Sequence, residues 1–478
     1  MSLVGEVERI RLRCEIEELA EAPGMEEIFD RLAGRPYSCF LDSSLTMDRL
    51  GRYSFIGFDP HLVLTTRGCD CRWWRREGGP AATVENPLLA LRRALDERVI
   101  DEGLPGLAPF LGGGMGYLSY ELGRYIERLP GKAVDDLALP ELCFAFYDRI
   151  LTHDHTTGKI YLAALHQDNP GKVIEEARRE LTRVIPEYPT GDIKTRPSFL
   201  SNFSRDQYIE AVKKVKEYIY AGDIYQANLT QRFEVELKEH PWTLYRRLRR
   251  LNAAPFSAYF NAVEAQICSS SPERYLKGEG SRVETRPIKG TRPRSDDAGE
   301  DSRLAGELLA SAKDRAELSM IVDLERNDLG RVCSYGSVDV KEHAVIESYA
   351  TVHHLVSTVV GELHPGRDVV DLLHASFPGG SITGAPKIRS MEIIDELEPT
   401  ARSIYTGSIG YLGYNGNFDL NIAIRTVIAK DGKAYFQVGG GIVADSVPED
   451  EYQETLDKGK AIFQALSTSP PKGDGYVC

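Results

Sequence analysis

The chain has 478 residues, of which 42% are hydrophobic and 27% charged, and its formal net charge is −14. This length predicts two domains, and the composition is typical of a globular protein. The acidic balance excludes nucleic acid as an expected partner. No apolar run reaches the roughly 18 residues of a membrane span, so we expect no membrane partner. An acidic protein that binds an anion needs local cations or a bound metal.

Residues 1–17 are rich in charge and lack the apolar core of a secretion signal. The eight cysteines lie apart and form no C-x-x-C pair, which argues against a zinc site. We therefore expect a cytoplasmic protein with reduced thiols.

Two glycine- and proline-rich segments follow in the first half of the chain. Residues 112–116 (GGGMG) lack the G-x-G-x-x-G spacing of a nucleotide-binding loop, and we interpret them as tight turns. Residues 185–197 contain three prolines and one glycine, which is typical of a linker. This linker predicts an N-terminal region, residues 1–190, and a C-terminal region, residues 198–468.

In the C-terminal region, apolar residues at helical spacing predict helices over residues 208–219 and over residues 388–397, with Pro386 where the second begins. Residues 405–444 change to a period of two. The dipeptides Asn415-Gly416 and Asp431-Gly432 predict hairpin turns there, and so an antiparallel meander of three strands. On its middle strand, Leu420, Ile422 and Ile424 would face the core, and Arg425 would point to the opposite face, toward either solvent or a ligand.

The last helix is expected to start after Ser446, with Ser446 and Glu449 as a capping box. Glu451 and Glu454 lie one turn apart on the same side of this helix. By themselves they are best explained as solvated carboxylates that the helix dipole favours.

Several segments between residues 205 and 465 resemble the chorismate-utilising family, which includes anthranilate, aminodeoxychorismate, isochorismate and salicylate synthases. They occur in the family's order: residues 221–226 (AGDIYQ), 271–273 (SPE), 287–294 (PIKGTRPR), 313–317 (KDRAE), 322–330 (VDLERNDLG), 354–357 (HLVS), 377–387 (FPGGSITGAPK), 421–426 (NIAIRT), 439–446 (GGGIVADS) and 451–455 (EYQET). Residues 41–43 and 51–57 are weaker matches. The resemblance implies an α+β fold, with two packed antiparallel β-sheets and outer helices as in anthranilate synthase component I.

Two positions indicate a branch of that family. Members that add water carry a lysine base where this chain has Gln226, so Gln226 implies an ammonia user. Lys289 stands in Pro-Ile-Lys-Gly-Thr, as in the aminodeoxychorismate branch, whereas anthranilate synthases carry alanine there. A lysine amine that adds to C2 of chorismate leaves ammonia only C4, which gives the para-substituted product. Without the motif, Lys289 would be read as a solvated loop lysine beside arginines.

The resemblance also implies the remaining roles. Glu273 matches the general acid for the C4 hydroxyl, although a surface glutamate is the simpler interpretation. Glu317 and Glu454 match ligands of Mg²⁺, with Glu451 an outer contributor, and the metal would hold the ring carboxylate. His354 matches a histidine beside the reacting ring. The expected substrate contacts are Gln226, Gly290, Thr291, Tyr405, Arg425, Gly439, Gly440 and Gly441.

The expected substrate is chorismate, aminated at C4 for 4-aminobenzoate and folate synthesis. The chain has no convincing cysteine–histidine glutaminase motif, so a glutamine amidotransferase subunit would supply the ammonia. The N-terminal region is a candidate site for bound tryptophan, because residues 41–43 resemble the regulatory pocket of anthranilate synthase. Two alternatives are an anthranilate synthase component I and a binding or scaffold protein without activity; the second predicts loss of Lys289 or of the acidic ligands, all of which are present.

Overall fold

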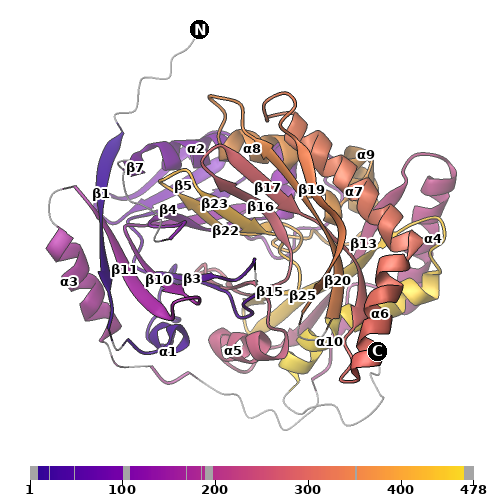
Figure 1. Cartoon of the computed structure of the whole chain (residues 1–478), viewed down its shortest axis with the longest axis horizontal. Helices are drawn as coiled ribbons and strands as arrows, with labels where there is room; N and C mark the ends of the chain where they lie inside the picture. The colour runs from indigo at the N-terminus through magenta and orange to yellow at the C-terminus, as the bar shows by residue number, and fades with distance from the viewer. Residues whose placement is uncertain are drawn as a thin grey trace.

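The computed structural model describes residues 9–20, 22–47, 49–100, 108–167, 170–182, 184, 186–188, 197–349 and 352–467. Two large and mostly antiparallel β-sheets form its centre, and the helices lie outside them (Figure 1). No helix in these ranges combines the length and the apolar character that crossing a membrane requires. The seven cysteines in these ranges are free thiols.

Within the described ranges, the first sheet has 13 strands. Their order is β12 (Leu200–Ser201), β13 (Gln226–Glu236), β25 (Lys433–Ile442), β24 (Thr426–Lys430), β15 (Gln266–Ser271), β14 (Phe256–Asn261), β2 (Cys39–Asp42), β3 (Tyr53–Gly57), β10 (Arg149–Asp154), β11 (Lys159–His166), β1 (Ile10–Glu18) and β7 (Arg98–Ile100). A short strand, β21 (Gly384–Ala385), pairs with β13. The pairing of β1 with β7 is parallel.

The second sheet has 12 strands in the same part of the chain. Their order is β18 (Ile288–Pro293), β20 (Val352–Glu362), β17 (Arg282–Arg286), β16 (Arg274–Glu279), β23 (Phe418–Asn421), β22 (Ser408–Gly413), β8 (Gly113–Leu118), β9 (Leu142–Tyr147), β4 (Leu62–Arg67), β5 (Asp70–Arg75) and β6 (Gly79–Val84). β19 (Asp339–Ser348) pairs with β20.

The helices are α1 (Met25–Asp30), α2 (Pro87–Asp96), α3 (Pro170–Leu181), α4 (Arg205–Tyr220), α5 (Pro241–Leu251), α6 (Ala298–Ala310), α7 (Ala312–Gly330), α8 (Val369–Ser376), α9 (Lys387–Leu397) and α10 (Pro448–Leu466), with short 3₁₀ turns η1 (Tyr120–Tyr125) and η2 (Gly380–Ile382). The predicted helices over residues 208–219 and 388–397 are confirmed as α4 and α9.

Strand β9 shows how the layers pack. Cys143 and Tyr147 belong to the apolar cluster between the two sheets. Phe144 and Phe146, on the opposite face, belong to the cluster that α2, α7 and α8 cover. Because successive side chains of a strand alternate in direction, a fully apolar strand buries both faces. The expected α+β fold of two packed sheets with outer helices is confirmed.

Both sheets contain strands from both predicted regions. In the first sheet Leu41 pairs with Ala258, and in the second Gly116 pairs with Gly410. The boundary at residue 190, most of the linker and residue 468 lie outside the described residues. The division into residues 1–190 and 198–468 therefore stays a prediction, and the two regions are joined by shared sheets.

The predicted three-stranded meander over residues 405–444 is wrong. Strands β22 and β23 form a hairpin in the second sheet, and β24 and β25 form one in the first. Residues 422–425 cross between the sheets, and Arg425 has a φ of +50°, which no regular strand allows. Alternation along one segment cannot show which sheet a strand joins. The core positions of Leu420 and Ile422 are confirmed, whereas Ile424 is only partly buried and packs against that core.

Two local interpretations are also corrected. The glycines of residues 113–116 lie on β8, where a Cβ on Gly116 would come within 2.0 Å of the Cys143 carbonyl oxygen, so they permit close approach of strands rather than tight turns. The helix α10 has Val447 as its N-cap and Pro448 at its first position, and there is no side-chain capping bond because valine has no acceptor. The Ser446 hydroxyl donates to Glu451 instead, at 2.6 Å.

Candidate active site

Lys289 lies on β18 at an irregularity of its pairing with β20, where the register shifts between Lys289 and Thr291. Gly290 has a φ of +78°, and a Cβ there would lie 2.9 Å from the side chain of Asp314. A bulge of this kind redirects the neighbouring side chain. The Lys289 Nζ donates to the main-chain carbonyl of Ser381 at 2.9 Å.

Burial lowers the pKa of the Lys289 amine below its usual value of 10.5. Glu273 and Glu317 act in the opposite direction, while the nearby ammonium of Lys458 lowers this pKa further. A lysine must lose its proton before it can act as a nucleophile. The buried surroundings of Lys289 favour that neutral form. A lysine in solvent, the alternative interpretation, would have no such lowered pKa.

Glu273 lies between β15 and β16 and is only 5% exposed, so it is not a surface glutamate. Burial raises its pKa, and hydrogen bonds from the Ser381 side chain and the Ile288 backbone N–H, with the charge of Lys289, moderate the rise. A carboxyl group that keeps its proton toward neutral pH is suited to general acid catalysis. Ser381 therefore contacts both Glu273 and Lys289.

His354 lies on β20, opposite Thr291, and is 3% exposed. Its Nδ1 is hydrogen-bonded to the Thr291 hydroxyl at 2.9 Å, and its Nε2 is buried with no hydrogen-bond partner among the described residues. Burial, with a contribution from the charge of Arg425, lowers its pKa to about 3, so the ring is neutral. A buried nitrogen without a partner is costly unless a ligand uses it.

Gln226 begins β13, whose partner β25 carries the three expected glycines. Gln226 is 1% exposed, and its Oε1 has no hydrogen-bond partner in the described part of the chain. A Cβ on Gly441 would come within 2.1 Å of the Gln226 Nε2, and one on Gly439 within 2.4 Å of the Leu229 carbonyl oxygen. Glycine in these positions leaves room for the Gln226 side chain and for close strand pairing.

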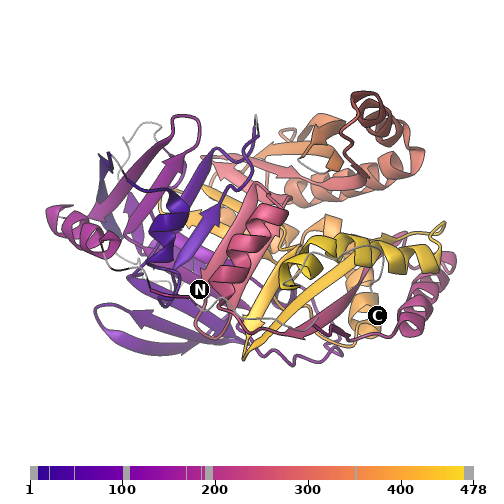
Figure 2. The ribbon, with the colours of Figure 1, turned by 90° about the horizontal axis from the view of Figure 1, so that it is seen from below.

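The expected metal-binding carboxylates come from two helices, α7 and α10; in the right-hand half of Figure 2 the yellow helix α10 lies below the salmon-coloured lobe to which α7 belongs. A Cβ on Gly440 would lie 3.3 Å from Glu451 and 3.4 Å from Glu454, so both carboxylates of α10 converge over that glycine. Glu317 on α7 interacts electrostatically with Glu451, and burial raises the pKa of both.

The donor set suits Mg²⁺, which prefers carboxylate oxygens. In the described ranges, however, no three acidic, histidine or cysteine side chains are already gathered at metal-binding distance. Lys458 accounts for part of this arrangement, since its Nζ lies 2.6 Å from Glu454. Burial acts to raise the pKa of Glu454, but this ion pair together with the charges of Lys313 and Lys289 lowers it overall.

Arg425 and Tyr405 lie on adjacent segments, because the Thr406 N–H donates to the Ala423 carbonyl at 2.9 Å. The guanidinium of Arg425 donates to Asn252 at 3.2 Å, and burial lowers its pKa. The charge of Arg425 lowers the pKa of His354, so the guanidinium lies close to that ring. Tyr405 is buried and its main electrostatic partner is Arg402, so its side chain is tied to a different network.

Sequence reasoning missed Ser381 and Lys458. Ser381 lies inside the segment 377–387 that carries the resemblance, but a serine among glycines and prolines has no pattern that marks its contacts. Lys458 follows Glu454 by one helical turn, which usually indicates an ordinary surface ion pair.

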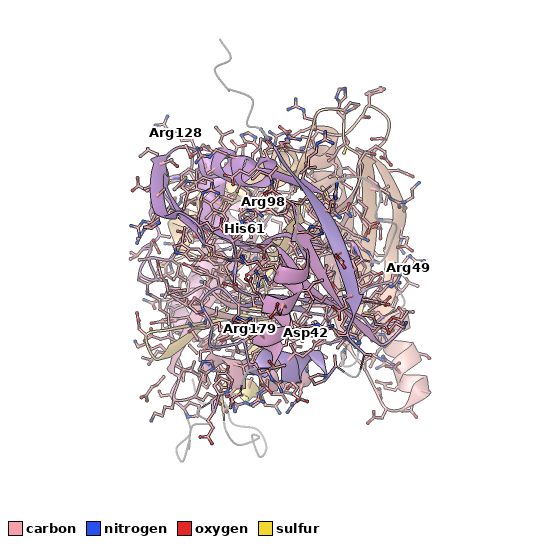
Figure 3. All side chains as sticks on the ribbon, turned by 90° about the vertical axis from the view of Figure 1, so that its left-hand side faces the viewer. Asp42, Arg49, His61, Arg98, Arg128 and Arg179 are labelled. Carbon is pink, nitrogen blue, oxygen red and sulfur yellow. The ribbon has the colours of Figure 1, made fainter. Side chains whose placement is uncertain are left out.

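A separate cavity of about 730 Å³ lies between strands of both regions. It is lined by Asp42, Ser43 and Tyr53 from the N-terminal region and by Phe256 and Tyr411 from the C-terminal region. Figure 3, viewed from the side on which β1 and α3 lie, labels Asp42 and Arg49 of this lining. None of the expected catalytic residues lines it.

A family model described as "chorismate binding enzyme" matches residues 43–464. The fold is that of this class, and the chain belongs to the family. It is 42% identical to aminodeoxychorismate synthase component 1 of Bacillus subtilis over 92% of this chain and 94% of the relative. It is also 42% identical to anthranilate synthase component 1 of Thermus thermophilus, over 91% and 94%. The crystal structure of anthranilate synthase component I from Streptococcus pneumoniae superposes with a TM-score of 0.77 at 31% identity, covering 88% of this chain and 94% of that one.

Proposed function

We propose that this protein aminates chorismate at C4 with ammonia, through a covalent adduct on Lys289, and releases 4-amino-4-deoxychorismate. The observation that carries the proposal is the pairing of Lys289, whose pKa is lowered, with Glu273, whose pKa is raised, across their shared contact Ser381. Such opposed shifts suit a nucleophile and a general acid.

The chemistry balances in two displacements. In the first, the lone pair of Lys289 forms a bond to C2, the ring double bonds shift, and the C4–O bond breaks. Glu273 gives its proton to the departing hydroxyl, which leaves as water, and the carboxylate recovers a proton from the new ammonium. In the second, ammonia bonds to C4, the double bonds shift back, and the C2–N bond breaks; the proton that the new C4 ammonium gives up goes to the departing nitrogen of Lys289, which is again a neutral amine. The sum is chorismate plus ammonia giving the aminated product plus water.

Replacing Lys289 tests this mechanism directly. In Lys289→Ala we expect formation of the para-aminated product to fall by about 10² to 10⁴, as for loss of a catalytic nucleophile or base. Because C2 is then open, part of the remaining turnover should give ortho-aminated product. Chromatography of reactions with chorismate, Mg²⁺ and ammonium measures both products.

Intact-mass analysis of the unaltered protein with chorismate and no ammonia should show an adduct that Lys289→Ala lacks. Unchanged para product from Lys289→Ala would show that the amine takes no part, and the chain would then be a chorismate enzyme of a different mechanism.

Glu317, Glu451 and Glu454 would hold Mg²⁺, and the bound metal would supply the positive charge that attracts the ring carboxylate of chorismate. Residues of the chain orient the rest of the substrate: Arg425 offers a guanidinium, His354 an unpartnered ring nitrogen, and Gln226 an unpartnered amide oxygen. With the metal, these groups would give this acidic protein the local positive charge and hydrogen bonds that binding an anion requires.

The ammonia would come from a separate glutamine amidotransferase subunit. The relatives named component 1 support this, because that name belongs to one part of a two-component enzyme. The product would serve synthesis of 4-aminobenzoate and folate, and the free thiols support a cytoplasmic location.

Anthranilate synthesis is the second candidate, because an anthranilate synthase component 1 is as similar to this chain as an aminodeoxychorismate synthase component 1. The two proposals differ at Lys289. The product chromatography above separates them, since anthranilate lacks the enolpyruvyl group.

We further propose that the separate cavity binds tryptophan. Its lining combines the aromatic rings of Phe55 and Tyr411 with the charged groups of Asp42 and Arg49, which suits an aromatic zwitterion. Titration calorimetry with L-tryptophan should show one site per chain. A thermal shift should follow, about 2.7 kcal/mol of stabilisation at one hundred times Kd. If neither a calorimetric signal nor a thermal shift is observed, the cavity does not bind tryptophan.

A further inference from the structure

The 3₁₀ turn η2 connects the two proposed catalytic groups. The main-chain carbonyl of Ser381 accepts a hydrogen bond from Lys289 Nζ at 2.9 Å, and the Ser381 side chain is hydrogen-bonded to Glu273. A neutral amine that donates one N–H to a fixed carbonyl has fewer orientations for its lone pair. The position of this turn therefore restricts the directions in which the Lys289 lone pair can point.

A buried carboxylate of α7 holds the turn in place. Glu325 is 3% exposed, and its Oε1 accepts the Gly380 backbone N–H at 3.1 Å. The fit is close, because a Cβ on Gly380 would come within 2.7 Å of Leu324 and 3.1 Å of the same Glu325 oxygen. The other oxygen of Glu325 accepts a long hydrogen bond from Thr285 of β17, at 3.5 Å. Glu325 is thus tied to the turn on one side and to the second sheet on the other.

The charges around Glu325 come from four elements or junctions. Asp328 lies one turn further along α7, Lys387 on α9, Tyr275 on β16, and Glu273 between β15 and β16. Burial, with the charge of Asp328, raises the pKa of Glu325 to about 7. Lys387 is itself committed to Asp328, at 2.5 Å, and to the Ser376 carbonyl, at 2.7 Å. Lys387, whose charge acts to lower the pKa of Glu325, is thus shared with Asp328, while Glu325 stays buried in contact with the turn.

We propose that Glu325 is a positioning residue: by accepting the Gly380 N–H it fixes the Ser381 carbonyl, and so sets the geometry in which the Lys289 amine attacks the substrate. The inference rests on the proposed function, and it assigns a role to an acidic residue that touches neither substrate nor metal ligands. Its effect acts through Gly380 and Ser381 on Lys289.

Two substitutions separate hydrogen bonding from bulk. Glu325→Gln keeps an oxygen acceptor for Gly380 N–H, whereas Glu325→Leu has a similar volume and no acceptor. We expect kcat for the para-aminated product to fall about 10- to 100-fold in Glu325→Leu, with KM for chorismate changed less than about twofold, because a small misplacement of a reacting group slows chemistry more than binding. Glu325→Gln should keep kcat within about threefold of the unaltered protein.

Asp328→Asn is the matched control, since Asp328 is equally buried, 3% exposed, on the same helix, and bonded to Lys387 rather than to the turn. It should lower the melting temperature while leaving the rate of adduct formation, followed by quenching and intact mass, near that of the unaltered protein. Glu325→Leu should slow adduct formation as much as it lowers kcat. Equal slowing in Asp328→Asn and Glu325→Leu, or adduct formation in Glu325→Leu at the unaltered rate, overturns the role of Glu325. An unaltered protein that forms no adduct at all overturns the proposed function instead.

Discussion

At the scale of single residues, the site depends on two pKa shifts of opposite sign produced by the same burial. Desolvation penalises a charged amine and a charged carboxylate alike, so it lowers the pKa of Lys289 and raises that of Glu273. Their mutual attraction opposes both shifts. The rate of adduct formation should therefore rise with pH as Lys289 loses its proton and fall as Glu273 loses its own.

Glu273→Gln tests the second half of this argument. The amide cannot donate a transferable proton, so the rate of adduct formation should fall by about 10² to 10⁴. Because the carboxyl group no longer titrates, one limb of the bell-shaped dependence on pH should disappear. Single-turnover rates between pH 5 and 10 measure this, and a variant with both limbs intact would assign the acid to another group.

At the scale of elements, the bulge of β18 aims Lys289 out of the sheet. Gly290 is required there for two separate reasons: its φ of +78° and the lack of space for a Cβ beside Leu308 and Asp314. A regular strand pairing at this point would redirect the lysine relative to Ser381. The motif around Lys289 thus encodes a backbone shape as well as a nucleophile.

Gly290→Ala should reduce the free energy of unfolding by about 1–3 kcal/mol, the cost of a strained backbone position, and lower kcat more than it raises KM. Gly432→Ala is the control, since Gly432 has a φ of +73° and no atom within 4 Å of an added Cβ. It should lose stability through φ alone and keep its activity. Denaturant melts and steady-state kinetics of both variants decide the matter, and equal loss of kcat in both would contradict the role of the bulge.

At the scale of the whole molecule, contacts between residues far apart in sequence join the two predicted regions. His61, labelled in Figure 3, is hydrogen-bonded through Nε2 to the Tyr414 hydroxyl at 2.9 Å. Burial, with the charges of Arg98, Arg76 and Arg75, lowers the pKa of His61 to about 3. The folded protein therefore keeps this ring neutral where an unfolded chain would protonate it.

The sign of the pH effect follows from that difference. Below the unfolded pKa of about 6.5, the unfolded chain binds a proton that folded His61 refuses, so stability falls as the pH drops from 6.5 toward 3. We expect His61→Gln to remove about 2 kcal/mol of the stability loss between pH 7 and pH 5. Urea melts at both pH values measure it, and an unchanged stability loss in His61→Gln would contradict this role of His61.

Local sequence patterns determined the class of this protein, its packed sheets and two of its helices. Motifs in family order predicted the class and the packed sheets, helical spacing predicted α4 and α9, and the motif around Lys289 implied an amine whose pKa is lowered. These succeed because periodicity and motif spacing are properties of neighbouring residues.

Only the tertiary structure decided which sheet each strand joins and which groups meet. The chain leaves one sheet at Asn421 and enters the other at Thr426, and no alternation pattern encodes that crossing. Ser381 contacts Lys289 directly, although the two residues lie 92 positions apart in sequence. Glu325, 36 positions from Lys289, is linked to it through Gly380 and Ser381. Side-chain contacts between distant segments arise from packing of the whole chain, and for that reason they could be read only from the folded molecule.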